Sequence, residues 1–252
     1  MKTHRRLGKG PTIVFQHGLL GGWQAWKAQM EHFAPFFDVI ALNLPGFSDR
    51  SDEEALESID AIAAGQIALL DSLGVEKFSF IGHSLGGMTA QAVALQAGNR
   101  LDRLVLYGTA MSPNLPGRFE THDETIARLQ RDGLDKAAPD LVASWFMAGK
   151  DDPHYEDTMA LAHMSSVDAA CAVIRAMQGW DATNRIGTIN VPTLVISGDQ
   201  ERNVIPEVTH ELWRALPNGR LCILPDCAHA AHMERAGLFN TIVGEFLSAA
   251  QY

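Results

Sequence analysis

Short apolar runs bounded by turn residues recur along the chain and predict the strands of a sheet. They lie at residues 12–15, 38–42, 78–81, 104–107, 193–197 and 220–224. Each run is rich in Val, Ile, Leu and Phe, as expected for strands that are buried on both faces of a parallel sheet. Helical patterns lie between most of the runs, at residues 59–73, 88–96 and 207–216. This alternation predicts an open, doubly wound α/β sheet.

The alternation stops between residues 111 and 188. Helical patterns follow one another there without a convincing strand, at residues 123–131, 134–147, 154–163 and 168–177. We therefore expect a helical cap at 111–188, inserted between two strands of one core that is formed by residues 1–110 and 189–252. Such an insertion would cover the carboxyl ends of the strands, where α/β proteins bind their ligands.

Composition and charge exclude several classes of protein. Hydrophobic residues make up 46% of the 252 residues and charged residues 20%, which is a globular profile. The net charge of −10 provides no positive field to attract nucleic acid. No stretch approaches the roughly 20 apolar residues that span a bilayer, and the basic residues 2–9 precede no secretory apolar region. We expect a soluble, cytoplasmic protein with neither nucleic acid nor membrane as a partner.

The cysteines and histidines do not form a metal-binding pattern. Cys171, Cys222 and Cys227 are odd in number and have no close-paired spacing, which favours free thiols over a disulfide framework or a zinc site. His229 and His232 lack the glutamate of a zincin motif. The sequence therefore predicts no metal site.

A serine stands between one predicted strand and one predicted helix. The segment Gly82-His83-Ser84-Leu85-Gly86 follows the strand at 78–81 and leads into the helix at 88–96. A sharp strand-to-helix turn needs small residues at both glycine positions, because the backbone crowds itself there, and it exposes the serine hydroxyl. The motif alone also occurs in ordinary glycine-rich turns. Its flanking strand and helix make Ser84 a predicted nucleophile.

A serine nucleophile needs a base and an acid, and with this turn their chain order is Ser, acid, His. His229 lies in the loop directly after the last predicted strand, whereas its competitor His232 lies farther along. The acid is expected after the preceding strand, where Asp199 and Glu201 both occur. Either carboxylate could accept a hydrogen bond from the histidine Nδ1 and stabilise the imidazolium. The residues alone leave that choice open.

Two backbone N–H groups are candidates for an oxyanion hole. The N–H of Leu85 lies at a helix amino terminus, whose partial positive charge suits a developing oxyanion. The loop after the first strand contains His17-Gly18 and offers the N–H of Leu19. We expect both groups to face the carbonyl oxygen as it becomes negative.

These residues together resemble the α/β-hydrolase superfamily across nearly the whole chain. The matching parts are His17-Gly18, the Leu44-Pro45-Gly46-Phe47-Ser48 segment, the turn at Ser84 and the tail at 192–246. Within the superfamily the chain is most similar to the 3-oxoadipate enol-lactonase branch, in which the acid stands third after a glycine and a proline follows five residues later. Gly198, Glu201 and Pro206 reproduce that spacing.

The resemblance implies Glu201 as the acid, with Asp199 as the alternative. Two features depart from the branch. Its acid is usually Asp, whereas Glu201 is one methylene longer. Only 16 residues precede His17, so we expect the first edge strand that is usual in the family to be absent.

The residues and the resemblance together predict a cofactor-free serine hydrolase, monomeric or homodimeric, that cleaves a small carboxylic ester or lactone through an acyl-enzyme. Trp145, Phe146, Met147, Met164 and Trp180 would line an apolar pocket under the cap, unless they are plain core residues. Alternatives on the same triad are a carbon–carbon bond hydrolase, a lyase and a cofactor-free perhydrolase. A non-catalytic ligand-binding protein is the alternative of another class, but it would not need an intact Ser, acid and His set.

Overall fold

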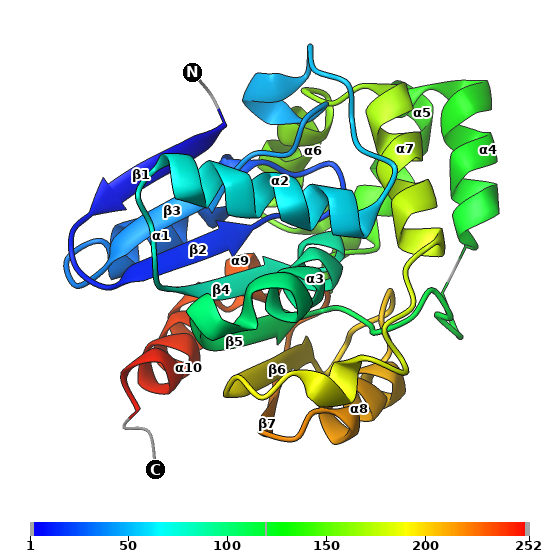
Figure 1. Cartoon of the computed structure of the whole chain (residues 1–252). Coiled ribbons are helices and arrows are strands. Elements are labelled where there is room, and N and C mark those ends of the chain that lie inside the picture. The colour runs from blue at the N-terminus through cyan, green and yellow to red at the C-terminus, as the bar shows by residue number, and fades with distance from the viewer. Residues whose placement is uncertain (1–2, 119, 250–252) are drawn as a thin grey trace.

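A seven-stranded sheet forms the centre of the molecule (Figure 1). The structure is a computed structural model and describes residues 3–118 and 120–249. The strand order is β1-β3-β2-β4-β5-β6-β7, and every neighbouring pair is parallel except β1 with β3. The strands are β1 (His4–Gly8), β2 (Thr12–Gln16), β3 (Asp38–Leu42), β4 (Phe78–His83), β5 (Leu101–Tyr107), β6 (Thr193–Gly198) and β7 (Gly219–Leu224).

Helices cover both faces of the sheet and enclose one apolar core on each side. The first core takes side chains from α2 (Ile59–Ser72), α3 (Leu85–Ala97) and α8 (Pro206–Ala215). The second takes side chains from α1 (Lys27–Phe33) and α10 (Ala236–Ser248), which is preceded by the short α9 (Ala231–Glu234). The predicted doubly wound α/β fold is confirmed.

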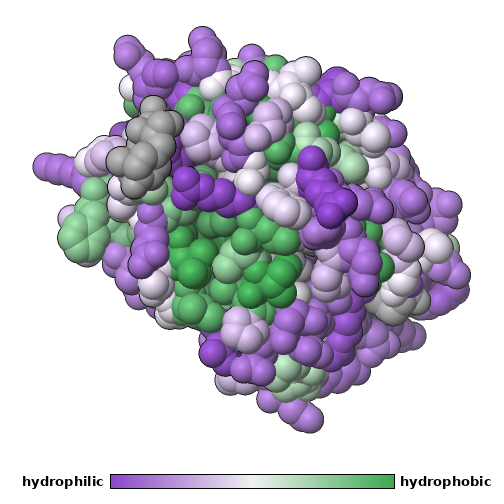
Figure 2. All heavy atoms as spheres, turned by 90° about the horizontal axis from the view of Figure 1, so that it is seen from below, coloured by the Kyte–Doolittle hydropathy of each residue, from purple (hydrophilic) through white to green (hydrophobic). Residues whose placement is uncertain are grey.

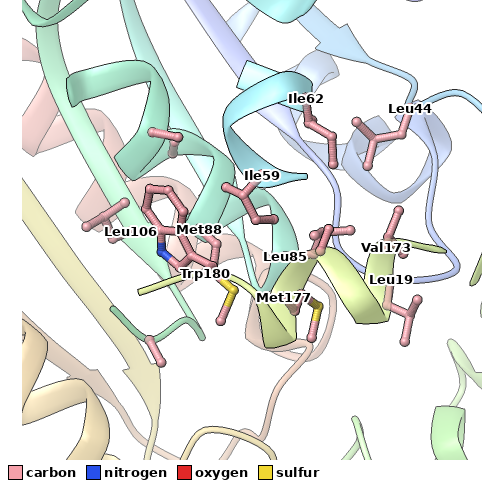
Figure 3. Close-up of a cluster of buried hydrophobic side chains, with 14 of the residues drawn as sticks. Leu19, Leu44, Ile59, Ile62, Leu85, Met88, Leu106, Val173, Met177 and Trp180 are labelled. Carbon is pink, nitrogen blue, oxygen red and sulfur yellow. The ribbon is translucent and has the colours of Figure 1, made fainter. Parts of the chain in front are cut away.

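Four helices of the described chain lie between β5 and β6, in the segment that the sequence predicts to be a cap. They are α4 (His122–Asp132), α5 (Leu134–Ala143), α6 (Tyr155–Ala162) and α7 (Val167–Gln178), and the described part of this segment contains no strand. α7 joins the cap to the first core: Figure 3 shows its side chains Val173 and Met177 among core side chains such as Leu44 and Leu85. The inserted helices are thus anchored on the same apolar core as the sheet.

One predicted absence is wrong, because the sheet has an edge strand ahead of β2. β1 pairs with β3 in antiparallel register, and Arg6 holds Asp38 of β3 through two hydrogen bonds of 2.8 Å each. Residues 5–8 of the strand are exposed. An edge strand that is exposed in this way needs no apolar run, so its basic sequence gave no periodic signal.

On one face of the molecule most of the surface residues are hydrophilic (Figure 2). On the face that carries β7, α8 and α10, Figure 2 shows one cluster of hydrophobic residues among polar ones. No helix in residues 3–118 and 120–249 is long and apolar enough to cross a membrane.

Candidate active site

Ser84 stands in the turn between β4 and α3, in a backbone conformation that is rare for residues other than glycine. Its φ is 55° and its ψ is −118°. A Cβ on Gly82 would lie 2.2 Å from the carbonyl oxygen of Gly86, and one on Gly86 would lie 2.4 Å from that of Gln16. Real Cβ contacts are never so short, so both positions need glycine, as the sequence predicts. The turn is held by the Ser84 N–H, which donates to the Tyr107 carbonyl at 2.9 Å.

His229 follows β7, and its ring is paired with Glu201. The His229 Nδ1 to Glu201 Oε2 distance is 2.6 Å, and both side chains are buried. The other oxygen of Glu201 accepts from the backbone N–H groups of Asn203 at 2.7 Å and Val204 at 3.3 Å. Because Glu201 can only accept when ionised, the His229 Nδ1 carries the proton and Nε2 is left as an acceptor.

The surroundings of Glu201 favour its ionised form. Burial alone would raise the pKa of the carboxyl group. The charge of His229 in its protonated form, its hydrogen bond and the N–H groups of Asn203 and Val204 outweigh this effect, and the pKa lies below its ordinary value. The carboxylate therefore keeps its hydrogen-bond acceptors for His229 at neutral pH.

Asp199, the alternative acid, does not contact His229. Its side chain is exposed, and its Oδ1 accepts only a long hydrogen bond of 3.4 Å from the Cys227 N–H. Gly198 allows the loops after β6 and β7 to approach closely, because a Cβ there would lie 2.3 Å from the Cys227 carbonyl oxygen. With the two loops this close, Glu201, the third residue after Gly198, lies against His229.

The first oxyanion candidate, the Leu19 N–H, belongs to a peptide unit that is fixed by His17. The His17 Nδ1 donates to the Gly18 carbonyl at 2.8 Å, and its Nε2 accepts from the Leu44 N–H at 3.2 Å. Burial lowers the pKa of His17 to about 4, against the hydrogen bond to Gly18, so the ring is neutral at pH 7. Since the Gly18 carbonyl and the Leu19 N–H share one peptide plane, fixing the carbonyl also fixes the N–H.

The second candidate, the Leu85 N–H, lies in the first turn of α3. N–H groups in a first turn have no partner within the helix. The adjacent Gly18 leaves room for the serine, because a Cβ there would lie 3.1 Å from the Ser84 Cβ.

Ser84 and His229 border the same cavity, as do Leu19 and the predicted competitor His232. The described residues contain no hydrogen bond between the Ser84 hydroxyl and the His229 ring, and such contacts often form only with substrate bound. The cavity has about 60 Å³ of free space and is mainly apolar. Its walls include the cap residues Leu115, Arg118, Leu141, Trp145, Phe146 and Met177.

Two of the five residues predicted for the pocket lie in it, Trp145 and Phe146. Met147 and Met164 do not line it, and Trp180 is a plain core residue, which the sequence left as the alternative for all five. Met147 and Met164 are 45% and 39% exposed, and neither borders this cavity. Trp180 is buried in the first core beside Met88 (Figure 3). Helical spacing identifies an apolar side of a helix, but not which part of that side faces a cavity.

The sequence gave no sign of the aromatic cluster behind His229. The His83 Nε2 donates to the His229 carbonyl at 2.9 Å, and the Tyr107 hydroxyl donates to the same oxygen. The two rings stack with centroids 4.5 Å apart, and the His232 ring lies against Trp26 at 4.6 Å. Burial lowers the pKa of His232 to about 3, with the charge of His229 acting in the same direction. His232 thus belongs to this buried packing and makes no contact with Glu201.

The doubly wound sheet, the serine in its strained turn and the buried His–Glu pair define the class of α/β hydrolases. Residues 11–236 match the family described as alpha/beta hydrolase fold. The chain belongs to this family, and it is a hydrolase.

Three known proteins illustrate the similarity. A RutD protein of Agrobacterium fabrum (strain C58), whose name proposes that it is a carbamate hydrolase, is 30% identical over 248 residues, which cover 96% of this chain and 95% of that protein. The enol-lactonase from Burkholderia xenovorans LB400 has a TM-score of 0.91 at 23% identity, covering 98% of this chain and 96% of that one. A thermophilic esterase from Thermogutta terrifontis has a TM-score of 0.86 at 25% identity, covering 97% and 92%.

Proposed function

We propose that the protein is a serine hydrolase that cleaves a small carboxylic ester or lactone through an acyl-enzyme. The observation that carries this proposal is the 2.6 Å hydrogen bond between His229 and Glu201, at the side of a cavity that Ser84 also borders. The pairing leaves the His229 Nε2 free to take the serine proton.

In the proposed reaction the Ser84 Oγ bonds to the carbonyl carbon while the His229 Nε2 takes its proton. The carbonyl oxygen becomes negative and accepts from the N–H groups of Leu19 and Leu85. The tetrahedral intermediate then expels the alkoxide, which takes the proton from His229. Water attacks the acyl-enzyme with His229 as base, and the carboxylic acid leaves as Ser84 recovers its proton. Glu201 orients the His229 ring and stabilises its charged form throughout.

Residues 111–188 serve in this proposal as a lid over a core formed by 1–110 and 189–252. The lid supplies Leu141, Trp145 and Phe146 to the cavity wall. A free space of about 60 Å³ has room for only a few water-sized groups, which supports either a short acyl group or opening of the lid on binding.

A fluorophosphonate probe and a series of p-nitrophenyl esters test the proposal. Wild type is expected to be labelled and to hydrolyse the short esters. Ser84→Ala is expected to lose both, and His229→Ala is expected to lose ester hydrolysis. Ser72→Ala removes an exposed hydroxyl that donates to the Leu69 carbonyl, and it serves as the matched control with full labelling and activity. Labelling of Ser84→Ala at the wild-type rate would refute the proposal.

A carbamate is the second candidate substrate, because the similar RutD protein carries that name. The same triad could attack a carbamate carbonyl. p-Nitrophenyl carbamate and p-nitrophenyl acetate differ only in NH₂ against CH₃, so their kcat/KM values, corrected for the enzyme-free rates, decide between the two classes.

A carbon–carbon hydrolase, a lyase and a perhydrolase stay alternatives on the same triad. The cytoplasmic location and the monomeric or dimeric state stay predictions.

A further inference from the structure

One arginine borders the cavity that contains Ser84. Arg118 lies in the segment between β5 and α4, before the first helix of the cap. Among the described residues that line this cavity, it is the sole lysine or arginine, and the lining includes no aspartate or glutamate. The histidines His17 and His232, which also line it, have pKa values lowered by burial to about 4 and about 3, so they are neutral at pH 7. Arg118 therefore supplies a fixed positive charge to an otherwise mainly apolar space.

Among residues 3–118 and 120–249, no acidic side chain forms an ion pair with the guanidinium of Arg118. Its Nε and Nη1 atoms are buried and have no hydrogen-bond partner among the described residues. Glu120 is the acidic residue whose charge acts on it, but both oxygens of Glu120 are already taken by Arg128, at 2.8 Å each. Burial lowers the pKa of Arg118, and the charge of Glu120 only partly opposes this effect.

A buried charge without a partner is costly, and a planar guanidinium matches the two oxygens of a carboxylate. A neutral substrate would leave the buried N–H groups of Arg118 unsatisfied. We propose that Arg118 binds a carboxylate of the substrate, so that the ester or lactone cleaved at Ser84 is an anion. This inference rests on the proposed function of Ser84, and it adds the substrate class and a residue that selects it.

A second recess, lined by residues of the segment 113–123 and by Gln178, is the alternative place for an anion. Arg118 also borders this recess, together with Glu120, His122 and Gln178, and the recess has about 400 Å³ of free space. An anion bound there would not compete with an ester bound at Ser84. Competition kinetics therefore distinguish the two positions.

Matched neutral and anionic esters test the inference. p-Nitrophenyl hydrogen glutarate and p-nitrophenyl pentanoate differ by a carboxylate in place of a methyl group on the acyl side. 4-Acetoxybenzoate and methyl 4-acetoxybenzoate differ by a carboxylate in place of its methyl ester, on the leaving group. The measured quantity is the ratio of kcat/KM for the anionic ester to that for the neutral ester, after subtraction of the enzyme-free rate.

Wild type is expected to prefer the anionic ester in at least one pair. Arg118→Gln should lower that ratio by about 10- to 100-fold, the size of a hydrogen bond to a charged group, and Arg118→Lys should lower it less. Arg131→Gln removes an exposed cap arginine that pairs with Asp132, and it should leave the ratio unchanged. Glutarate should inhibit wild type competitively. Thermal unfolding of each variant identifies any that fail to fold.

Three results would each overturn the inference. The first is that wild type shows no preference for the anionic ester, and the second is noncompetitive inhibition by glutarate. The third is an unchanged ratio in folded Arg118→Gln, or in Arg118→Lys if Arg118→Gln does not fold. Failure of the proposed function gives a different result, because Ser84→Ala would then still hydrolyse the neutral esters.

Discussion

Replacing Glu201 by glutamine changes one oxygen of a buried carboxylate into an NH₂ group. The two oxygens of Glu201 accept from different donors, Oε2 from the His229 Nδ1 and Oε1 from the N–H groups of Asn203 and Val204. Glutamine has one acceptor oxygen, so either orientation places an NH₂ group against a donor. If the oxygen stays with the backbone, the His229 ring must move its proton to Nε2, and the acceptor for the serine proton is lost.

We expect this change to lower kcat for a p-nitrophenyl ester by on the order of 10³- to 10⁴-fold, the effect of holding a triad histidine in the wrong tautomer. This corresponds to about 4 to 5.5 kcal/mol of activation free energy. KM should change much less, because Glu201 does not line the cavity that Ser84 borders. The measurement is steady-state hydrolysis of p-nitrophenyl butyrate, with thermal unfolding to establish that the variant is folded.

Asp199→Asn is the matched control, since it makes the same chemical change two residues earlier on an exposed side chain. Its one hydrogen bond, from the Cys227 N–H at 3.4 Å, can still be accepted by an amide oxygen. We expect kcat within about twofold of wild type, as for most surface substitutions. The assignment of the acid is refuted if Glu201→Gln keeps more than about a tenth of the wild-type kcat, or if Asp199→Asn is the inactive variant.

Further predictions concern the turn, the oxyanion loop and acid stability. Gly82→Ala, whose Cβ would lie 2.2 Å from the Gly86 carbonyl oxygen, should lower the free energy of unfolding by several kcal/mol, measured in urea; a loss under 1 kcal/mol would contradict the packing argument. His17→Ala leaves the Leu44 N–H without its partner and should lower kcat by about 5- to 100-fold with little change in KM; an unchanged kcat would show that His17 does not hold the Leu19 peptide. The folded-state pKa values of His17 and His232, about 4 and about 3, lie below the unfolded value near 6.5, so the unfolded chain binds more protons between these limits. Stability should therefore be fully present above pH 6.5 and fall below it, by up to about 1.4 kcal/mol per pH unit for each histidine, and equal urea midpoints at pH 7 and pH 5 would contradict this.

The order of strands and helices could be predicted from the sequence, because it depends on local periodicity. Strands buried on both faces, such as β3 and β6, contain continuous apolar runs. The need for glycine at positions 82 and 86 could also be predicted from the sequence, since the backbone crowding that requires it arises at the turn around Ser84. β1 could not be predicted from the apolar pattern, because its exposed position at the edge of the sheet requires no apolar residues.

The identity of the carboxylate partner was decided by tertiary structure. Asp199 and Glu201 stand two residues apart with the same chemistry, and both follow the strand that should carry the acid. Only the packing of the β6 loop against the β7 loop, through the close approach of Gly198 to Cys227, turns Glu201 toward His229 and Asp199 toward solvent. The environment of Arg118 was also decided by tertiary structure. Its buried Nε and Nη1 have no hydrogen-bond partner among the described residues, because the nearby Glu120 accepts from Arg128, and that contact forms only when the segment is folded. The sequence by itself determined the fold and the position of Ser84, because both follow from local patterns, whereas the contacts between distant loops decided which charges face the cavity.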